Sequence, residues 1–200
     1  MTTTARGKKP THTLVSQAFS RDAAPAQLSA AIVSLVELCQ RAMPDPKKIR
    51  KALVDEAKFV TGKQAQADEM GGMIALDSKI IGAPVTGLRH ELFGRERTEE
   101  PVIILLSVGK SEGKEVVFLT AAFRGAIEAD VVKAVTHVTK KKPFGGGRTQ
   151  NVNGELTRRV FWDVEGEAGV RGMVAWGPDN VEETRVLRGV TAFNRAGVKK

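Results

Sequence analysis

Apolar runs separated by turn residues predict the central part of the fold, between positions 101 and 193. Residues 101–108 are apolar almost throughout and have the length of a buried strand. A glycine-bounded turn at 109–113 separates them from 115–123, which is rich in β-branched and aromatic residues. Because a short loop joins these two runs, we expect an antiparallel hairpin.

The spacing of the apolar positions changes after this hairpin. Acidic residues at Glu128 and Asp130 suit the first turn of a helix, and the lysines that follow position 139 suit its end. The apolar residues between them recur at helical spacing: Ile127, Val131, Ala134, Val135 and Val138. This pattern predicts an amphipathic helix near 127–140.

A second unit repeats the plan. Apolar and polar residues alternate at 160–164 and again at 170–176, with a turn at 165–169 between them. The segment 178–193 begins with Pro-Asp and carries apolar residues at helical spacing, so a helix is predicted there. Asn153-Gly154 is a strong two-residue hairpin signal and predicts an extra hairpin before this unit.

Two more helices are predicted before the sheet, as a helical hairpin over about 25–62. Pro44 ends the first helix, and Asp45-Pro46 provides the cap and first residue of the second. The first apolar stripe consists of Leu28, Ile32, Leu35, Val36, Cys39 and Met43, and the second of Ile49, Leu53, Ala57 and Val60, with Gly62 as terminator.

The predicted fold class is therefore α+β, with a mainly antiparallel sheet of four or five strands made from two hairpin-plus-helix units. The sheet part spans about 100–195, and residues 12–200 form one domain. Residues 1–11 are basic and rich in threonine, which predicts a disordered tail.

Three further segments are short and less regular. Residues 14–19 are compatible with a leading strand, and 74–81 with either a strand or a short helix. Residues 88–93 are interpreted as one or two helical turns.

Composition adds a net charge of +8 and 42% hydrophobic residues over 200 positions, enough for a real core. The single cysteine, Cys39, excludes an internal disulfide, and its place on an apolar stripe predicts a small buried side chain. The chain shows neither a secretory signal nor an apolar run of the roughly 20 residues that a membrane span needs. We expect a cytoplasmic protein without a membrane partner.

The basic residues concentrate in two places, which become the candidate nucleic-acid-binding residues. Eleven basic residues face five acidic ones in 1–63, and eight face four in 101–150. The candidates are Lys140, Lys141, Lys142, Phe144 and Arg148 in the connector, and Lys47, Lys48 and Lys51 in the second helix. Lysine and arginine contact phosphates, glycines allow close approach and an aromatic ring stacks on bases. The alternatives are a well-capped helix followed by a flexible loop, and a solvated helix face.

Catalytic chemistry is weakly indicated. Asp163, Glu165 and Glu167 alternate as Mg²⁺ ligands do at a strand end, but they fall in a predicted turn, so we expect them not to be catalytic. The three histidines lack the spacing of a zinc site, and neither a metal nor a cofactor is expected. His90 and Glu91 are adjacent, and neighbouring residues do not face each other.

Three functions remain open. The first is a non-enzymatic nucleic-acid-associated protein that binds the phosphate backbone through its basic segments. The second is a self-associating structural protein or a phage- or defence-type accessory protein, whose charge serves solubility. The third is a small metal-dependent nuclease that uses the Asp163 cluster.

Overall fold

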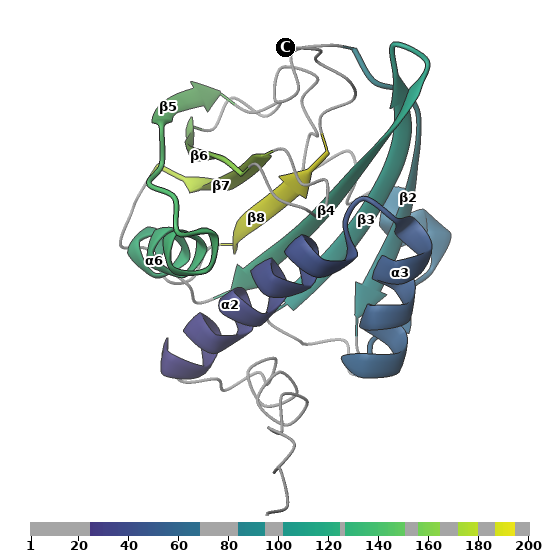
Figure 1. The fold of residues 1–200 in the computed structure, drawn as a ribbon, viewed down its shortest axis with the longest axis horizontal. Helices are drawn as coiled ribbons and strands as arrows, with labels where there is room; N and C mark the ends of the chain where they lie inside the picture. Colours follow the sequence, from purple (N-terminus) through teal and green to yellow (C-terminus); the bar gives the residue numbers. More distant parts are fainter. Residues whose placement is uncertain are drawn as a thin grey trace, which may run out of the picture.

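An eight-stranded sheet forms the centre of the protein (Figure 1). The computed structural model describes residues 25–68, 84–94, 102–124, 127–150, 156–164, 172–179 and 187–194. Within these ranges every strand pair is antiparallel, in the order β1-β2-β3-β4-β8-β7-β6-β5. The predicted α+β class is confirmed. The predicted number of four or five strands was too low.

The elements alternate between helices and meanders. The helices are α2 (Pro25–Ala42), α3 (Pro46–Lys51) with its π-helical continuation η1 (Ala52–Glu56), a short helical stretch at 64–68, and α6 (Glu128–Thr139). The strands are β1 (Val60–Thr61), β2 (Thr86–Gly94), β3 (Val102–Ser111), β4 (Lys114–Arg124), β5 (Gly145–Gln150), β6 (Leu156–Asp163), β7 (Gly172–Pro178) and β8 (Leu187–Phe193). A helix thus precedes each four-stranded meander, and the last strands β4 and β8 pair at the centre.

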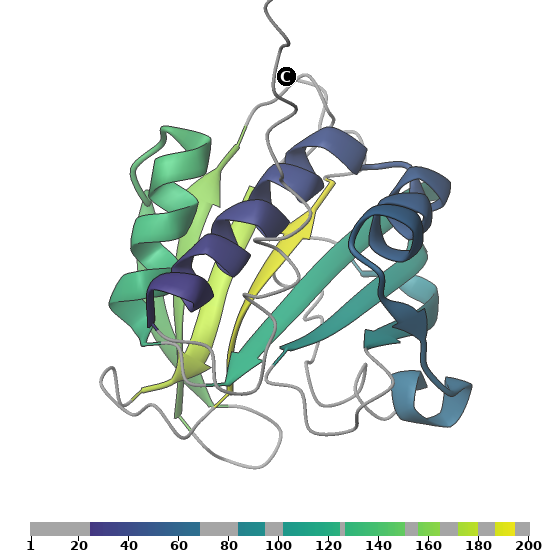
Figure 2. The ribbon, with the colours of Figure 1, turned by 90° about the horizontal axis from the view of Figure 1, so that it is seen from below.

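Helices α6, α2 and α3 form one layer over one face of the sheet (Figure 2). The predicted stripe of α2 faces the core, where Ile32, Val36 and Cys39 are buried. Two side-chain contacts tie α6 to β6: Trp162 Nε1 donates to Thr136 Oγ1 at 3.3 Å, and Arg158 Nε donates to Glu128 Oε1 at 2.9 Å. The helix predicted near 127–140 is thereby anchored to the second meander.

The second helix begins as predicted and ends earlier. The Asp45 carboxylate accepts from the backbone amides of Lys47 and Lys48 at 2.9 and 3.3 Å, and so caps the helix. Lys58 then has φ +61°, which the helix cannot continue through. Val60 lies in β1, so the prediction that the helix reaches Gly62 was wrong.

Strands β3 and β4 form the predicted hairpin. Leu106 pairs with Leu119, and Glu112 and Gly113 make the turn with positive φ. Ile104 and Leu106 face the helices, while Leu105 lies on the other face, and all three are buried. Both faces of the central strands are therefore protected from solvent.

The helix predicted at 178–193 was wrong, because this segment contains the end of β7 and the strand β8. Strand β8 lies between β4 and β7, and buries Val190 on the helix-covered face and Thr191 on the other. A strand buried on both faces lacks a polar alternation, so its pattern resembles that of a buried helix. Close packing explains why glycine occupies position 189, because an added Cβ would lie 2.3 Å from Trp176 Cζ2.

Further differences concern the sheet edges. Residues 88–93 form part of β2 rather than helical turns. The connector becomes strand β5 from Gly145 onward, and β5 pairs with β6 in the extra hairpin that Asn153-Gly154 predicted. The tail 1–11 and the segments 14–19 and 74–81 lie outside the described residues.

Candidate functional site

The connector between α6 and β5 presents the predicted basic residues in one short stretch. We call Lys140, Lys141, Lys142, Phe144 and Arg148 the connector surface. All five side chains are exposed, and none of the three lysines has an ion-pair partner within the described ranges. Lys140 caps α6 with a left-handed backbone, φ +56°. The lysines therefore continue past the helix end rather than forming its last turn.

Phe144 is the large apolar side chain of this surface. Its side chain is 70% exposed, although its ring lies 6.2 Å from that of Phe161 on β6, centroid to centroid. Packing against Phe161 holds one part of the ring, and the remainder stays open to solvent. An aromatic ring in this setting offers a free face to a planar ligand.

Gly145, Gly146 and Gly147 form the first half of β5 and are exposed. None of them has a positive φ. An added Cβ at Gly145 or Gly147 would meet no atom within 4 Å, whereas at Gly146 it would lie 3.0 Å from the Arg159 carbonyl oxygen. Neither backbone conformation nor internal packing explains the outer two glycines, although glycine weakens a strand.

Arg148 closes the connector surface at its other end. Its Nε lies 2.8 Å from Asp179 Oδ1, just after β7. The arginine charge is therefore partly compensated, while the lysine charges are not. The positive potential of the surface comes mainly from Lys140, Lys141 and Lys142.

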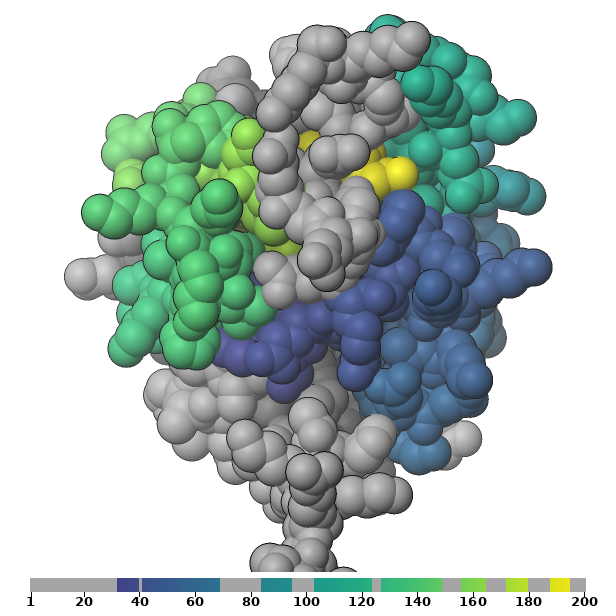
Figure 3. Space-filling model, viewed as in Figure 1, coloured from purple at the N-terminus to yellow at the C-terminus, as the bar shows by residue number. Residues whose placement is uncertain are grey.

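The structure does not bring the two predicted basic segments together. Lys47, Lys48 and Lys51 are exposed on α3, beside the β2 end of the sheet, whereas α6 and the connector lie at the β5 end (Figure 1). The space-filling view shows the green surface of α6 and the connector separated from the blue surface of α3 (Figure 3). The α3 lysines are thus a distinct, solvated group.

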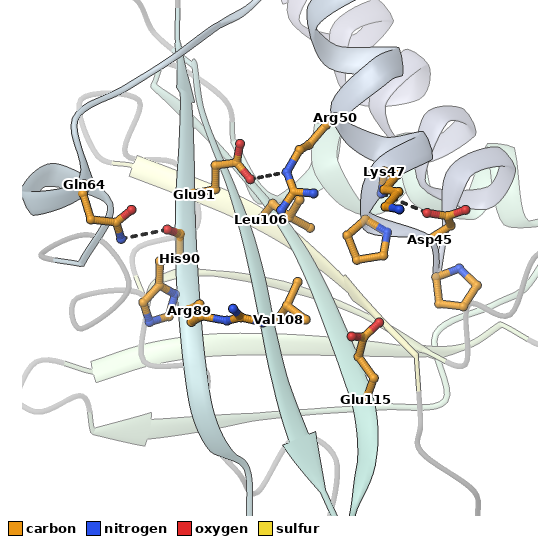
Figure 4. Close-up of a pocket in the computed structure, with 12 residues that line it drawn as sticks. Asp45, Lys47, Arg50, Gln64, Arg89, His90, Glu91, Leu106, Val108 and Glu115 are labelled. Carbon is orange, nitrogen blue, oxygen red and sulfur yellow. Dashed lines mark hydrogen bonds and ion pairs between the residues drawn. The ribbon is translucent and has the colours of Figure 1, made fainter.

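A cleft of about 730 Å³ lies beside α3 and was not predicted from the sequence (Figure 4). Its floor includes Leu106 and Val108, and an ion pair between Arg50 and Glu91 crosses one side. The charged side chains that line it are balanced, three basic and three acidic: Lys47, Arg50, Arg89, Asp45, Glu91 and Glu115. The cleft therefore favours neither anions nor cations. No short sequence motif could have predicted it.

His90 lies on the other face of β2 from Glu91, so the two do not form a proton-handling pair. His90 Nδ1 is 2.8 Å from Ser107 Oγ. Burial lowers the pKa of His90 below its ordinary value, and the nearby Asp68 carboxylate opposes this effect. Gln64 Nε2 donates to Asp68 Oδ1 at 2.8 Å and to the His90 carbonyl oxygen at 3.0 Å. These contacts are structural.

The remaining candidates do not assemble a catalytic centre in the described part of the chain. Cys39 is buried as predicted, and burial raises the pKa of its thiol to about 12. Asp163 is exposed at the end of β6, while Glu165 and Glu167 lie outside the described residues. Among described residues, no three His, Cys, Asp or Glu side chains are grouped to hold a metal ion. The described helices include none with the length and apolarity needed to cross a bilayer.

The connector surface combines positive charge, one exposed aromatic ring and backbone that carries no side chains. Such groups can bind and orient a ligand. Comparison with protein-family models, curated proteins and solved structures finds no match, so the function has to be argued from these residues.

Proposed function

We propose that the chain is a non-enzymatic nucleic-acid-associated protein that binds the phosphate backbone of a single strand through the connector surface. The observation that carries this proposal is a short segment with three exposed lysines, which have no ion-pair partner in the described part of the chain, and an open aromatic ring. Proteins that bind single strands combine cationic side chains along the backbone with rings on which bases stack.

Lys140, Lys141 and Lys142 supply the electrostatic part. Each ammonium that replaces a counterion on a phosphate gains free energy from the release of that ion. These side chains are free to reach a ligand, because no described carboxylate holds them. Arg148 adds a forked donor at the far end of the surface, where it would exchange part of its contact with Asp179 for a phosphate.

Phe144 and the glycines supply the short-range part. A base that stacks on the open face of Phe144 would lie next to strand residues without side chains at Gly145 and Gly147. Backbone can therefore approach the ligand closely at positions where any other residue would place a side chain. Close approach of a ligand would account for Gly145 and Gly147, which internal packing does not explain.

The main test is binding of a fluorescein-labelled oligothymidylate, measured by fluorescence anisotropy over a series of salt concentrations. Replacing Lys141, Lys142 and Arg148 with alanine should flatten the plot of log affinity against log salt by about 0.7 per lost phosphate contact. The matched control removes three cations from α3, as Lys47→Ala, Lys48→Ala and Lys51→Ala, and should leave the slope near that of the parent. Equal slopes in the parent and the connector variant would exclude the connector surface.

Phe144→Ala tests the stacking contribution separately. Loss of one stacked base should weaken binding by about 1–3 kcal/mol without changing the salt slope. Phe144→Trp is the control, because it keeps an open ring and should retain affinity. An unchanged affinity in Phe144→Ala would remove stacking from the proposal and leave only charge.

The same oligonucleotide, incubated with Mg²⁺ or Mn²⁺, tests the nuclease alternative. Asp163 is exposed at the end of β6, and we expect no cleavage that depends on it. Cleavage that disappears in Asp163→Ala and persists in the α3 control variant would replace the binding function with a catalytic one.

A further inference from the structure

Strand β5 is the outermost strand at its end of the sheet. It pairs with β6 and, among the described residues, with no other strand. One row of its backbone N–H and C=O groups therefore points away from the sheet. Such an edge is a template for a further strand, and proteins commonly block it with proline, with lysine or with a covering element.

The first half of β5 contains none of these blocking residues. Gly145, Gly146 and Gly147 carry neither charge nor ring, and all are exposed. Arg148 is the charged residue of the strand, and its guanidinium contacts Asp179. The centre of the edge is therefore neutral and sterically open.

A second copy of the same chain is the partner that this edge fits best. Antiparallel pairing is isologous: the same edge can serve both partners around a twofold axis. All pairs in the described sheet are antiparallel already, so a second β5 extends the existing pattern.

Charge is compatible with this arrangement. Antiparallel pairing centred on Gly146 or on Gly147 places Lys140, Lys141 and Lys142 of the two copies at opposite ends of the paired strands. Six residues of strand span about 20 Å, and a Debye length at physiological salt is about 8 Å. The two lysine groups therefore repel each other weakly, whereas parallel pairing would place them side by side.

We propose that the β5 edge pairs in antiparallel fashion with the β5 edge of a second copy, which joins the two sheets into one. This association does not depend on nucleic acid. Six paired residues bury less surface than a standard interface, so the dimer exchanges rapidly and depends on concentration. The dimer presents two connector surfaces on one assembly, and a strand that spans both would be held by two linked contacts.

Single-cysteine scanning of the edge tests the pairing and its register. The variants are Gly145→Cys, Gly146→Cys, Gly147→Cys and Arg148→Cys, each oxidised by diamide and followed on non-reducing gels. Because the native Cys39 thiol is buried, the introduced thiol is the one that reacts. The residue nearest the twofold axis faces its own copy and should cross-link in preference to its neighbours, since disulfides require a short Cβ–Cβ distance.

Lys133→Cys is the matched control, because Lys133 is exposed and belongs to α6 rather than to β5. It should not cross-link above the level of random collision. Equal cross-linking at all five positions would overturn the proposal.

Sedimentation velocity of the parent provides a second measurement that does not need a cysteine. The average mass should rise with protein concentration, and one of Gly146→Pro and Gly147→Pro should abolish the rise while the fold is kept, because alternate N–H groups point outward along a strand. A parent that stays monomeric at every concentration overturns the proposal. The proposal is also overturned if the parent stays monomeric and its β5 edge binds an acidic peptide, because the edge would then serve a different partner.

Discussion

The two ends of the sheet are built in opposite ways. At the β2 end, β1 adds a two-residue strand, the Gln64 side chain donates to the His90 carbonyl oxygen, and Arg50 pairs with Glu91. At the β5 end, exposed glycines line the outer strand and three lysines carry no described partner. The His90 carbonyl and the Glu91 carboxylate at the β2 end have partners within the protein, whereas the connector lysines at the β5 end have none among the described residues.

Exposure and charge alone therefore do not distinguish the α3 lysines from the connector lysines. The α3 lysines are as exposed as the connector lysines, but they lie beside a cleft whose charges are balanced. The connector lysines lie beside an open ring and bare backbone. Mutations at the β2 end should therefore act mainly on stability, and mutations at the β5 end mainly on binding.

The largest expected difference is between two phenylalanines. Phe93 on β2 is fully buried, and Phe93→Ala should lower the free energy of unfolding by about 3–5 kcal/mol because it leaves a cavity. Phe144 is 70% exposed, and Phe144→Ala should change it by no more than about 0.5 kcal/mol. Urea unfolding followed by tryptophan fluorescence measures both. Comparable losses in the two variants would show that Phe144 is a core residue and would contradict the comparison.

A smaller and opposite pair of effects is expected for two glycines. Gly189→Ala in β8 should destabilise the protein by about 1–3 kcal/mol, because the new Cβ would lie 2.3 Å from Trp176 Cζ2 and 2.8 Å from the Ala121 carbonyl oxygen. Gly147→Ala in β5 meets no atom within 4 Å and should gain about 0.5–1 kcal/mol from the reduced entropy of the unfolded chain. Thermal unfolding of the two variants measures both changes in stability. A loss of stability in Gly147→Ala would mean that this glycine already has a structural role.

The smallest expected effect is a pH dependence at the β2 end. Because burial lowers the pKa of His90 in the folded protein, the unfolded chain binds a proton more readily. The stabilising contribution of neutral His90 is therefore complete above its ordinary pKa of about 6.5 and is lost as the pH falls toward the lower folded value. The groups that face this ring are the Ser107 hydroxyl and the Asp68 carboxylate.

The free energies of unfolding of the parent and of His90→Gln, measured between neutral and mildly acidic pH, isolate this contribution. The difference between the two proteins should shift in favour of His90→Gln as the solution becomes more acidic. A difference that stays constant with pH would show that the ring titrates normally.

Local signals in the sequence predicted the elements whose chemistry is local. The Asp45 cap and the acidic first turn of α6 each act within a few residues, and each appears in the structure. The turn predicted at 109–113 is shorter, at Glu112-Gly113, because β3 extends to Ser111. The connector residues that were predicted to bind nucleic acid are exposed in the structure, and their binding role stays a prediction.

Elements that depend on distant partners were missed. Strand β8 is buried on both faces and has β4 and β7 on its two edges, and this central position leaves no periodic mark in the segment itself. The conversion of the connector glycines into a strand depends on pairing with β6, and the cleft beside α3 depends on the packing of five separate segments. Charge along the chain could not show that the two basic segments lie at opposite ends of one sheet.

The central pairing of β4 with β8 also governs how the chain reaches its native state. Thr120 and Thr191 share a buried hydrogen bond of 2.9 Å across 71 positions of sequence, and loop closure on this scale slows folding. Each meander can form from neighbouring hairpins, but β4 and β7 lack their shared neighbour until β8 has left the ribosome. Until β8 is available, the inner edge of β4 in the first meander therefore stays unpaired. During this interval the nascent chain is most exposed to aggregation and to chaperones.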